Sequence, residues 1–167
     1  MLKFSKYFVG ILFIISGLIK LNDPTGFSIK LEEYFVLFGL TFLNPMVLAL
    51  SVFICALEVI LGVALLLSLR NKLTAWLLLI LIVFFTILTG YSAISGKVTD
   101  CGCFGDAIKL SPWQSFMKDV ILLALILIIF KSKEKLTAAF SEKRQLSILL
   151  STTLLAILFG VFCLFYL

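Results

Sequence analysis

Long apolar stretches alternate with short polar segments along the whole chain, and this pattern predicts membrane-spanning helices. Crossing the hydrocarbon layer takes roughly 17–25 helical residues, and the chain has five stretches of suitable length and polarity. They are Phe4–Leu21, Pro45–Leu69, Leu73–Tyr91, Trp113–Phe130 and Leu146–Tyr166. The first begins like a signal peptide, but no small-x-small cleavage pattern follows it, so we expect a retained helix. The pattern as a whole predicts an all-α integral membrane protein.

The connection between the first two spans has a helical pattern of its own. Its apolar residues recur at helical spacing, while its charged residues fall on another face. The apolar set is Phe27, Leu31, Tyr34, Phe35 and Phe38. We expect a short helix in the membrane interface, capped at its start by Asp23 before Pro24. This helix either packs over the mouth of the bundle or forms a lid that binds quinone or lipid.

Two later spans each begin with an N-cap residue and a proline. Asn44 precedes Pro45, and Ser111 precedes Pro112. Because proline is favoured at the first helical position, we expect both helices to begin at these prolines. Ser111 and Gln114 also have the spacing of a capping box.

The composition agrees with the prediction of a membrane protein, and the distribution of basic residues predicts how its spans are oriented in the membrane. Hydrophobic residues make up 62% of the chain, whereas a soluble domain has about half. The net charge of +5 is not evidence of a nucleic-acid partner, because the basic residues flank the spans. Nine of the fourteen basic residues lie on one side if the N-terminus is cytoplasmic. We therefore expect a protein of the bacterial inner (plasma) membrane, with segments 22–44 and 92–112 on the periplasmic side.

The segment between the third and fourth spans carries the main candidate for chemistry, Cys101-Gly102-Cys103. Thiols outside the cytoplasm meet an oxidising compartment, so this pair can cycle between dithiol and disulfide. The short spacing closes a very small ring, whose strain would ease its reduction, and Gly102 supplies the backbone freedom that the ring needs. The supporting residues of the loop are Asp100, Phe104, Gly105 and Asp106.

Three other interpretations of this pair stay open. In these the cysteines would form an inert structural disulfide, remain unrelated free thiols, or bind a metal. We expect no metal, because the chain has no histidine and a structural zinc site takes four ligands. The remaining cysteines, Cys55 and Cys163, fall at different depths in their spans, and we expect both to be buried structural thiols.

Glu58 lies in the middle of the second predicted span. An ionised carboxylate is costly there, so this residue should face the bundle interior, be protonated, or have a partner. We expect one of two roles for Glu58: it takes part in a proton relay or a quinone contact, or it makes a structural hydrogen bond. The candidate partners for such a bond are Ser16, Ser51 and Thr86. Gly62, one turn further on, would let another helix approach closely.

Four features of the chain together resemble one family of membrane proteins. They are four core spans, the segment 17–24 that reads GLIKLNDP, the glutamate Glu58 in the second span, and the segment 100–106 that reads DCGCFGD. In these features the first 130 residues resemble the MauE branch of the DoxX-like proteins. The resemblance implies a four-helix membrane bundle in redox metabolism, since MauE is needed to mature a disulfide-rich subunit of methylamine dehydrogenase. DoxX relatives that serve a thiosulfate:quinone oxidoreductase add quinone as a candidate cofactor.

The rest of the chain departs from this four-helix plan. We expect a domain at 1–130, a basic cytoplasmic linker at 131–145 and an additional span at 146–167. This arrangement resembles longer members that continue into an outer segment, so a chain that stops at Leu167 is either a short member or part of a longer protein.

The sequence therefore predicts a membrane-embedded thiol–disulfide redox protein. Cys101 and Cys103 would exchange electrons with a thioredoxin-like or disulfide-containing client protein, and quinone is a possible coupled carrier. The main alternative is a non-catalytic anchor subunit of a redox complex, in which the loop disulfide is structural. A transporter built around Glu58 is a third reading.

Overall fold

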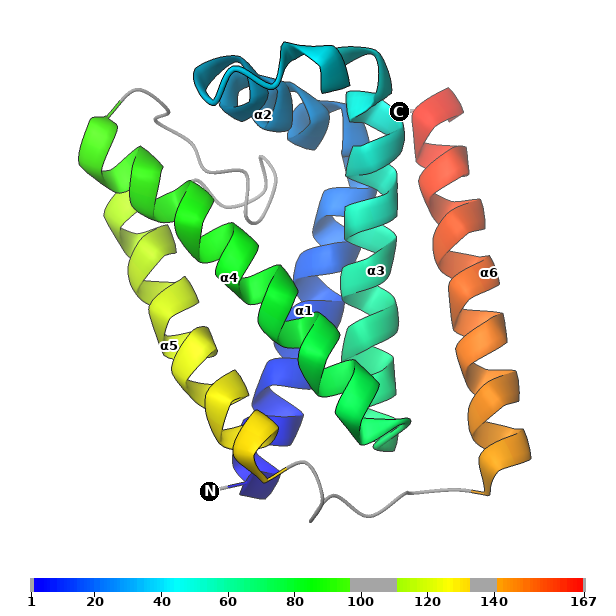
Figure 1. The fold of residues 1–167 in the computed structure, drawn as a ribbon. Helices are drawn as coiled ribbons and strands as arrows, with labels where there is room; N and C mark the ends of the chain where they lie inside the picture. Colours follow the sequence, from blue (N-terminus) through cyan, green and yellow to red (C-terminus); the bar gives the residue numbers. More distant parts are fainter. Residues whose placement is uncertain (1, 97–110, 133–140, 167) are drawn as a thin grey trace.

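The computed structural model describes residues 2–96, 111–132 and 141–166, and these residues fold almost entirely into helices (Figure 1). In chain order the elements are α1 (Leu2–Asn22), α2 (Pro24–Leu37), the 3-10 helix η1 (Thr41–Met46), α3 (Val47–Leu67), α4 (Asn71–Ser95), α5 (Pro112–Lys131) and α6 (Glu142–Tyr166). The prediction of an all-α protein is confirmed.

Five helices are long and apolar enough to cross a membrane. They are α1, η1 with α3, α4, α5 and α6, and they match the five predicted spans to within a few residues. Large apolar side chains point outward from these helices, among them Phe53, Ile80 and Leu155, each at least 60% exposed. Such a surface is stable only in contact with lipid, so the chain is a multi-pass membrane protein.

The helices α1 and α3 pack against each other closely because glycines line their contact. A Cβ atom on Gly62 would lie 2.7 Å from the backbone oxygen of Gly10. A Cβ atom on Gly17 would lie 2.9 Å from the backbone oxygen of Cys55. Small residues are the usual means by which membrane helices bring their backbones together. The prediction that Gly62 admits a neighbouring helix is confirmed, and that helix is α1.

The helices α4 and α5 form a second pair, packed through aromatic side chains. Trp76 and Phe130 meet edge to face with their ring centroids 4.9 Å apart. Phe116 lies against Gly90, where a Cβ atom would be 3.0 Å from the phenyl ring. The last helix, α6, packs along α3 at the edge of the bundle (Figure 1).

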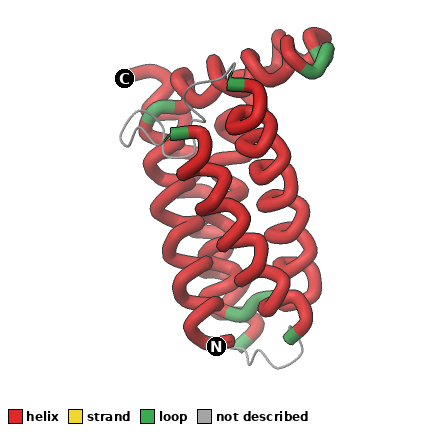
Figure 2. The backbone as a smooth tube through the Cα atoms, turned by 90° about the vertical axis from the view of Figure 1, so that its left-hand side faces the viewer, coloured by secondary structure: helices red, strands yellow, loops and turns green. Residues whose placement is uncertain are grey.

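The bundle has two distinct ends, and α2 lies across one of them, steeply inclined to the spans (Figures 1 and 2). The C-terminal end of α4 and the first residues of α5 are at this end, which we call the α2 end. The opposite end holds the start of α1, the turn between α3 and α4, the end of α5 and the start of α6. We call it the basic end, because most basic residues of the described segments lie there. They are Lys3, Lys6, Arg70, Lys72, Lys131, Lys143 and Arg144.

The predicted interface helix is present as α2. Its buried apolar residues are Phe27, Leu31, Tyr34 and Phe35, as expected. The prediction was wrong for Phe38, which ends the helix as its C-cap and is 41% exposed. This ring leaves the helical pattern because it packs on Tyr91 of α4, with centroids 5.1 Å apart.

Two of the three predicted helix starts are confirmed. The carboxylate of Asp23 accepts a hydrogen bond from the backbone N–H of Gly26 at 2.8 Å. Ser111 and Gln114 form the complete capping box at the start of α5.

The predicted start of α3 at Pro45 was wrong. Pro45 lies inside η1, and α3 begins two residues later at Val47. Asn44 does not cap a helix: its Oδ1 atom accepts no hydrogen bond from the described residues, and its side-chain nitrogen donates to the carboxylate of Glu32 at 3.1 Å. This contact across the connection holds η1 against α2.

Candidate functional site

The cysteine pair falls in a segment outside the described residues. Cys101 and Cys103, with Asp100, Gly102, Phe104, Gly105 and Asp106, all belong to 97–110. The structure describes the residues on either side of this segment, Gly96 at the C-cap of α4 and Ser111 at the N-cap of α5. Both lie at the α2 end (Figure 1). The predictions about the pair itself stay predictions.

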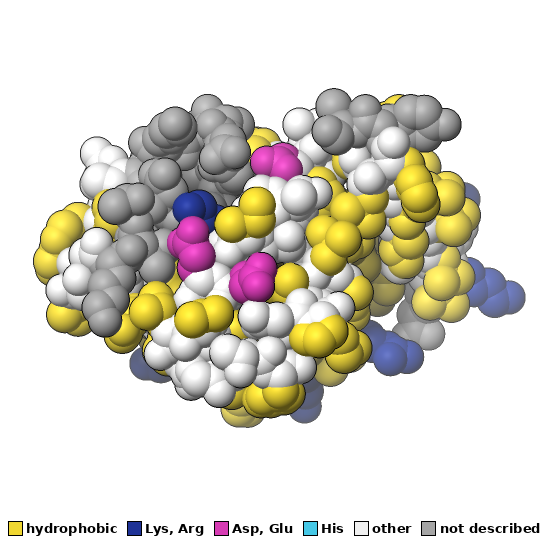
Figure 3. All heavy atoms as spheres, turned by 90° about the horizontal axis from the view of Figure 1, so that it is seen from above, with side chains coloured by type: hydrophobic (Ala, Val, Ile, Leu, Met, Phe, Trp, Pro, Cys, Tyr) yellow, Lys and Arg dark blue, Asp and Glu magenta, His cyan; other side chains and the backbone are white. Residues whose placement is uncertain are grey.

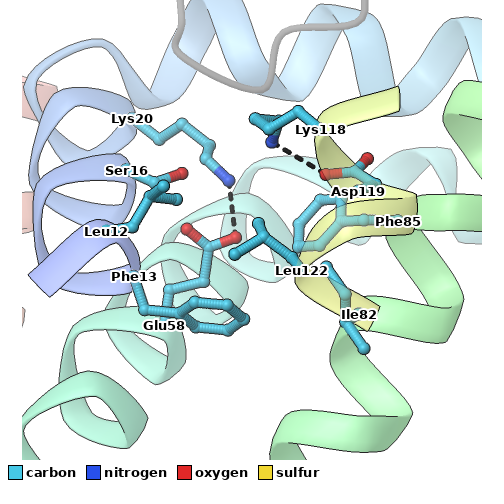
Figure 4. A pocket seen from close by; sticks show the side chains of 10 residues that line it. All are labelled: Leu12, Phe13, Ser16, Lys20, Glu58, Ile82, Phe85, Lys118, Asp119 and Leu122. Atoms are coloured by element: carbon cyan, nitrogen blue, oxygen red, sulfur yellow. Dashed lines mark hydrogen bonds and ion pairs between the residues drawn. The ribbon is translucent and has the colours of Figure 1, made fainter. Parts of the chain in front are cut away.

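Three charged side chains are buried together inside the bundle near the same end. Lys20 is 2% exposed, Glu58 is 3% exposed and Asp119 is 1% exposed. They come from α1, α3 and α5 and line one pocket (Figure 4). Charged residues inside a membrane bundle mark functional sites more often than structural ones, since each is costly to bury there. We call these three residues the charge cluster.

Lys20 and Glu58 form a direct ion pair. The ammonium nitrogen of Lys20 lies 2.5 Å from Oε1 of Glu58. Gly17, one turn before Lys20, packs against Cys55 and Val59 and so fixes α1 beside this part of α3. The ion pair therefore depends on the close helix contact described above.

Aromatic rings complete the surroundings of the Lys20 ammonium. It lies 4.4 Å from the ring centroid of Phe85 on α4 and 5.3 Å from that of Phe27 on α2. A cation over an aromatic face is stabilised by the quadrupole of the ring, and more so where water is excluded. Four elements, α1 to α4, thus contribute to holding this one charge.

Asp119 is held by a separate set of contacts. Its Oδ2 atom lies 3.0 Å from the hydroxyl of Thr89 on α4. Its Oδ1 atom lies 2.8 Å from the ammonium of Lys118, whose side chain is 20% exposed at the rim. Lys118 thus donates to one carboxylate oxygen of Asp119. The single hydroxyl proton of Thr89 is shared between the other carboxylate oxygen and the backbone oxygen of Phe85, which lies 2.9 Å away.

The pocket between these groups is small and partly polar. It leaves about 20 Å³ for the centre of a water-sized molecule. Its lining residues are Leu12, Phe13, Ser16, Lys20, Glu58, Ile82, Phe85, Lys118, Asp119 and Leu122. Oε2 of Glu58 is buried and has no hydrogen-bond partner among the residues that the structure describes. A buried carboxylate oxygen without a donor is costly, so this atom calls for explanation.

The depth of the charge cluster follows from helix geometry. Thr89 lies six residues before the end of α4 at Ser95, and Asp119 lies seven residues after the start of α5 at Pro112. At a rise of 1.5 Å per residue, both are about 10 Å from the helix ends that flank the cysteine segment. The cluster is therefore close to the helix ends that flank that segment.

The sequence identified Glu58 but not its partner. We expected a hydroxyl from Ser16, Ser51 or Thr86, whereas the partner at Oε1 is the ammonium of Lys20. Ser51 donates to the backbone oxygen of Pro24, and Thr86 donates to that of Ile82 in its own helix. Ser16 does line the pocket.

Sequence reasoning missed two members of the charge cluster. Lys20 was assigned to the end of the first span, and Asp119 was not considered. The available signal was depth, because Asp119 lies six residues, more than one and a half turns, inside the fourth predicted span. Cys55 and Cys163 are buried and free, as expected.

These observations define the class of the protein, a multi-pass helical membrane protein with a buried charge cluster near one end of its bundle. The family model for the methylamine utilisation protein MauE matches residues 1–132. The chain therefore belongs to the MauE family, and the match includes α1 to α5 and the cysteine segment.

A curated relative and a search of solved structures complete the comparison. Protein TlpB of Flavobacterium psychrophilum is 28% identical over 156 residues, which cover 92% of this chain and 41% of that protein. The chain thus spans less than half the length of this relative. No solved structure matches.

Proposed function

We propose that this chain is a membrane-embedded thiol–disulfide redox protein. Cys101 and Cys103 exchange electrons with a thioredoxin-like or disulfide-containing client protein on the periplasmic side of a bacterial inner membrane. One observation carries the proposal: the residues that flank the cysteine segment, Gly96 and Ser111, lie at the end of the bundle opposite the basic one.

The charge distribution supports the orientation. Basic residues gather on the cytoplasmic side of membrane proteins. The described segments hold seven basic residues at the basic end and three, Lys20, Lys30 and Lys118, towards the α2 end. Figure 3 looks onto the α2 end and shows acidic side chains exposed there among apolar ones. An N-terminus in the cytoplasm then directs the cysteine segment into an oxidising compartment.

The exchange reaction is balanced within the two proteins. The thiolate of one loop cysteine attacks a disulfide sulfur of the client and forms a mixed disulfide, which expels a client thiolate. The second loop cysteine attacks this mixed disulfide and releases the second client thiolate. The loop pair loses two electrons and two protons, and the client disulfide gains them. The same steps in reverse oxidise a client dithiol.

The comparisons support a role in maturing other proteins at the membrane. The MauE resemblance implies work on a disulfide-rich protein, and the family match includes both loop cysteines. The match covers 41% of TlpB, so much of that protein has no counterpart in this chain. The client or partner domain is therefore proposed and is not among the described helices.

A redox titration with thiol trapping tests the proposal. The protein is purified in detergent, with Cys55 and Cys163 replaced by alanine so that only the loop pair is labelled. We expect a reversible two-electron transition at a potential above about −300 mV, the upper limit for structural disulfides. A bond that resists reduction, or thiols that never pair, would overturn the proposal in favour of the anchor subunit with a structural disulfide.

Quinone coupling is a separable extension of this function. The charge cluster lies near the helix ends that flank the cysteine segment, but its pocket leaves only about 20 Å³, which is far less than a quinone ring needs. A quinone would therefore have to bind elsewhere or separate the helices. Reoxidation of the reduced loop pair by added quinone, in the Cys55→Ala/Cys163→Ala background, would establish the coupling, and its absence would leave the client protein as the electron acceptor.

A further inference from the structure

We infer that the pocket at the charge cluster is a hydration site, in which an ordered water donates a hydrogen bond to Oε2 of Glu58. This site lies inside the membrane bundle and does not depend on the cysteines. Its ligand is water, and its role is to connect a buried acid with the solution at the α2 end.

The unpartnered oxygen of Glu58 is the first argument. Glu58 is 3% exposed, and its Oε1 atom is occupied by Lys20. Glu58 lines the pocket, and its Oε2 atom has no donor among the described residues. An ionised carboxylate only accepts hydrogen bonds, so the missing group must be a donor. Water is the donor that buried sites in proteins usually recruit for such atoms.

The size and polarity of the pocket are the second argument. A water needs roughly 10–15 Å³ of space for its centre and two to four polar partners. The pocket leaves about 20 Å³, which is enough for one water and too little for a larger ligand. Figure 4 shows Glu58, Lys20 and Ser16 on one side of the pocket and Asp119 and Lys118 on the other. Polar partners are therefore available around it.

The arrangement of the lining gives the site one open direction. Towards the basic end the lining residues are apolar: Leu12, Phe13, Ile82 and Leu122. Towards the α2 end lies Lys118, whose side chain is 20% exposed. Water therefore reaches Glu58 from the α2 end, and the apolar floor separates the site from the opposite side.

The charges facing Glu58 are balanced. Lys20 comes from α1, Cys55 from its own helix α3, and Lys118 and Asp119 from α5. Among the pocket-lining residues α4 contributes only Ile82 and Phe85, neither of which titrates, and α2 contributes the ring of Phe27 over Lys20. Lys118 together with the three residues of the charge cluster gives two cations and two carboxylates, so the pocket is lined by equal numbers of positive and negative side chains.

Water-edited solid-state NMR tests the inference directly. The full chain, labelled with ¹³C at glutamate and leucine, is placed in vesicles of synthetic phosphatidylethanolamine and phosphatidylglycerol that contain no quinone. The Glu58 carboxyl signal is identified by its loss in Glu58→Gln. We expect magnetisation from water to reach this carbon nearly as fast as it reaches Glu33, and several-fold faster than it reaches the fully buried Leu78.

A matched pair of variants shows where the water is. Ser16→Val adds a methyl group to the pocket, and Ser5→Val adds the same group to a buried serine of the same helix at the basic end. We expect loss of the fast transfer to Glu58 in Ser16→Val and no change in Ser5→Val.

Three results would overturn the inference. The first is transfer to Glu58 as slow as transfer to Leu78. The second is equal transfer in both serine variants. The third is a fast signal that appears only after a quinol is added, since the donor would then be a lipid hydroxyl. The experiment is repeated with Cys101→Ser/Cys103→Ser, where we expect the same signal, so failure of the thiol chemistry and failure of the hydration site are distinguishable.

Discussion

Two acidic residues lie buried on opposite sides of one pocket, and their surroundings differ. Asp119 has a polar contact at each oxygen, with Thr89 and Lys118. Glu58 has one, Lys20, and its second oxygen is unpartnered among the described residues. Asp119 is thus complete within the protein and joins α4 to α5. Glu58 is incomplete, which is the property expected of a site that takes a ligand.

The two lysines differ in the same sense. Lys20 is 2% exposed and enclosed by a carboxylate and two rings, whereas Lys118 is 20% exposed. A lysine at the rim reaches water when its partner is removed, because its long side chain is flexible. An enclosed lysine does not. The two acids should also respond differently to the loss of their cation. Asp119 keeps the contact with the Thr89 hydroxyl, whereas Glu58 keeps no donor among the described residues.

The largest effect is expected when Lys20 is replaced by methionine. The change leaves Glu58 as an uncompensated buried charge, which costs about 3–5 kcal/mol in the free energy of unfolding. Denaturation in mixed micelles with increasing sodium dodecyl sulfate measures this. Lys118→Met is the matched control and should cost clearly less, since Thr89 still donates to Asp119. Equal losses in the two variants would remove the distinction between the sites.

A smaller effect is expected from Gly62→Ala. The added methyl group would lie 2.7 Å from the backbone oxygen of Gly10, so α1 and α3 must move apart. Overpacking of this kind costs about 1–3 kcal/mol and shifts Lys20 away from Glu58. Gly160→Ala is the control, because its added methyl group meets flexible side chains, the nearest at 3.0 Å. A tolerated Gly62→Ala would show that the ion pair does not need the close helix contact.

Removal of the Thr89 hydroxyl is expected to cost about 1 kcal/mol, the usual net value of one hydrogen bond. Thr89→Val removes a donor to Asp119 but leaves Lys118 in place. Thr86→Val is the control, since its hydroxyl contacts only the backbone oxygen of Ile82 in its own helix. Thermal unfolding in detergent should separate the two variants, and identical melting temperatures would argue against a role for Thr89 in holding Asp119.

The smallest effect is expected at the surface pair of α2. Lys30 lies 3.3 Å from Glu33, and both side chains are partly exposed. Pairs of this kind contribute about 0–1 kcal/mol, so Lys30→Ala should leave the melting temperature nearly unchanged. A large loss here would mean that α2 is held by its charges rather than by its buried apolar face.

The sequence was most informative where structure is local. The spans follow from runs of apolar residues, and the caps at Asp23 and Ser111 follow from contacts within three residues. Asn44 has the same local signature, but its side-chain nitrogen donates a hydrogen bond to Glu32, twelve residues away. A local rule cannot detect such competition.

The site was only partly predictable for the same reason. Glu58 was recognisable because a carboxylate in a span is unusual. Its partner Lys20 is 38 residues away, and the pairing depends on how glycines bring two helices together. Lys20 near the end of α1 is also compatible with an interfacial position, so its burial is a property of the assembled bundle.

The position of Lys20 near the end of α1 has a consequence for biosynthesis. This lysine is made and inserted 38 residues before Glu58. While α1 is alone in the bilayer, its long side chain can extend to the headgroups, so early insertion carries little penalty. Glu58, in the middle of a later span, cannot extend to the headgroups, but it enters a membrane in which its counter-ion is already present. The order of synthesis thus inserts the more costly charge, the Glu58 carboxylate, after its partner Lys20 is already in the membrane.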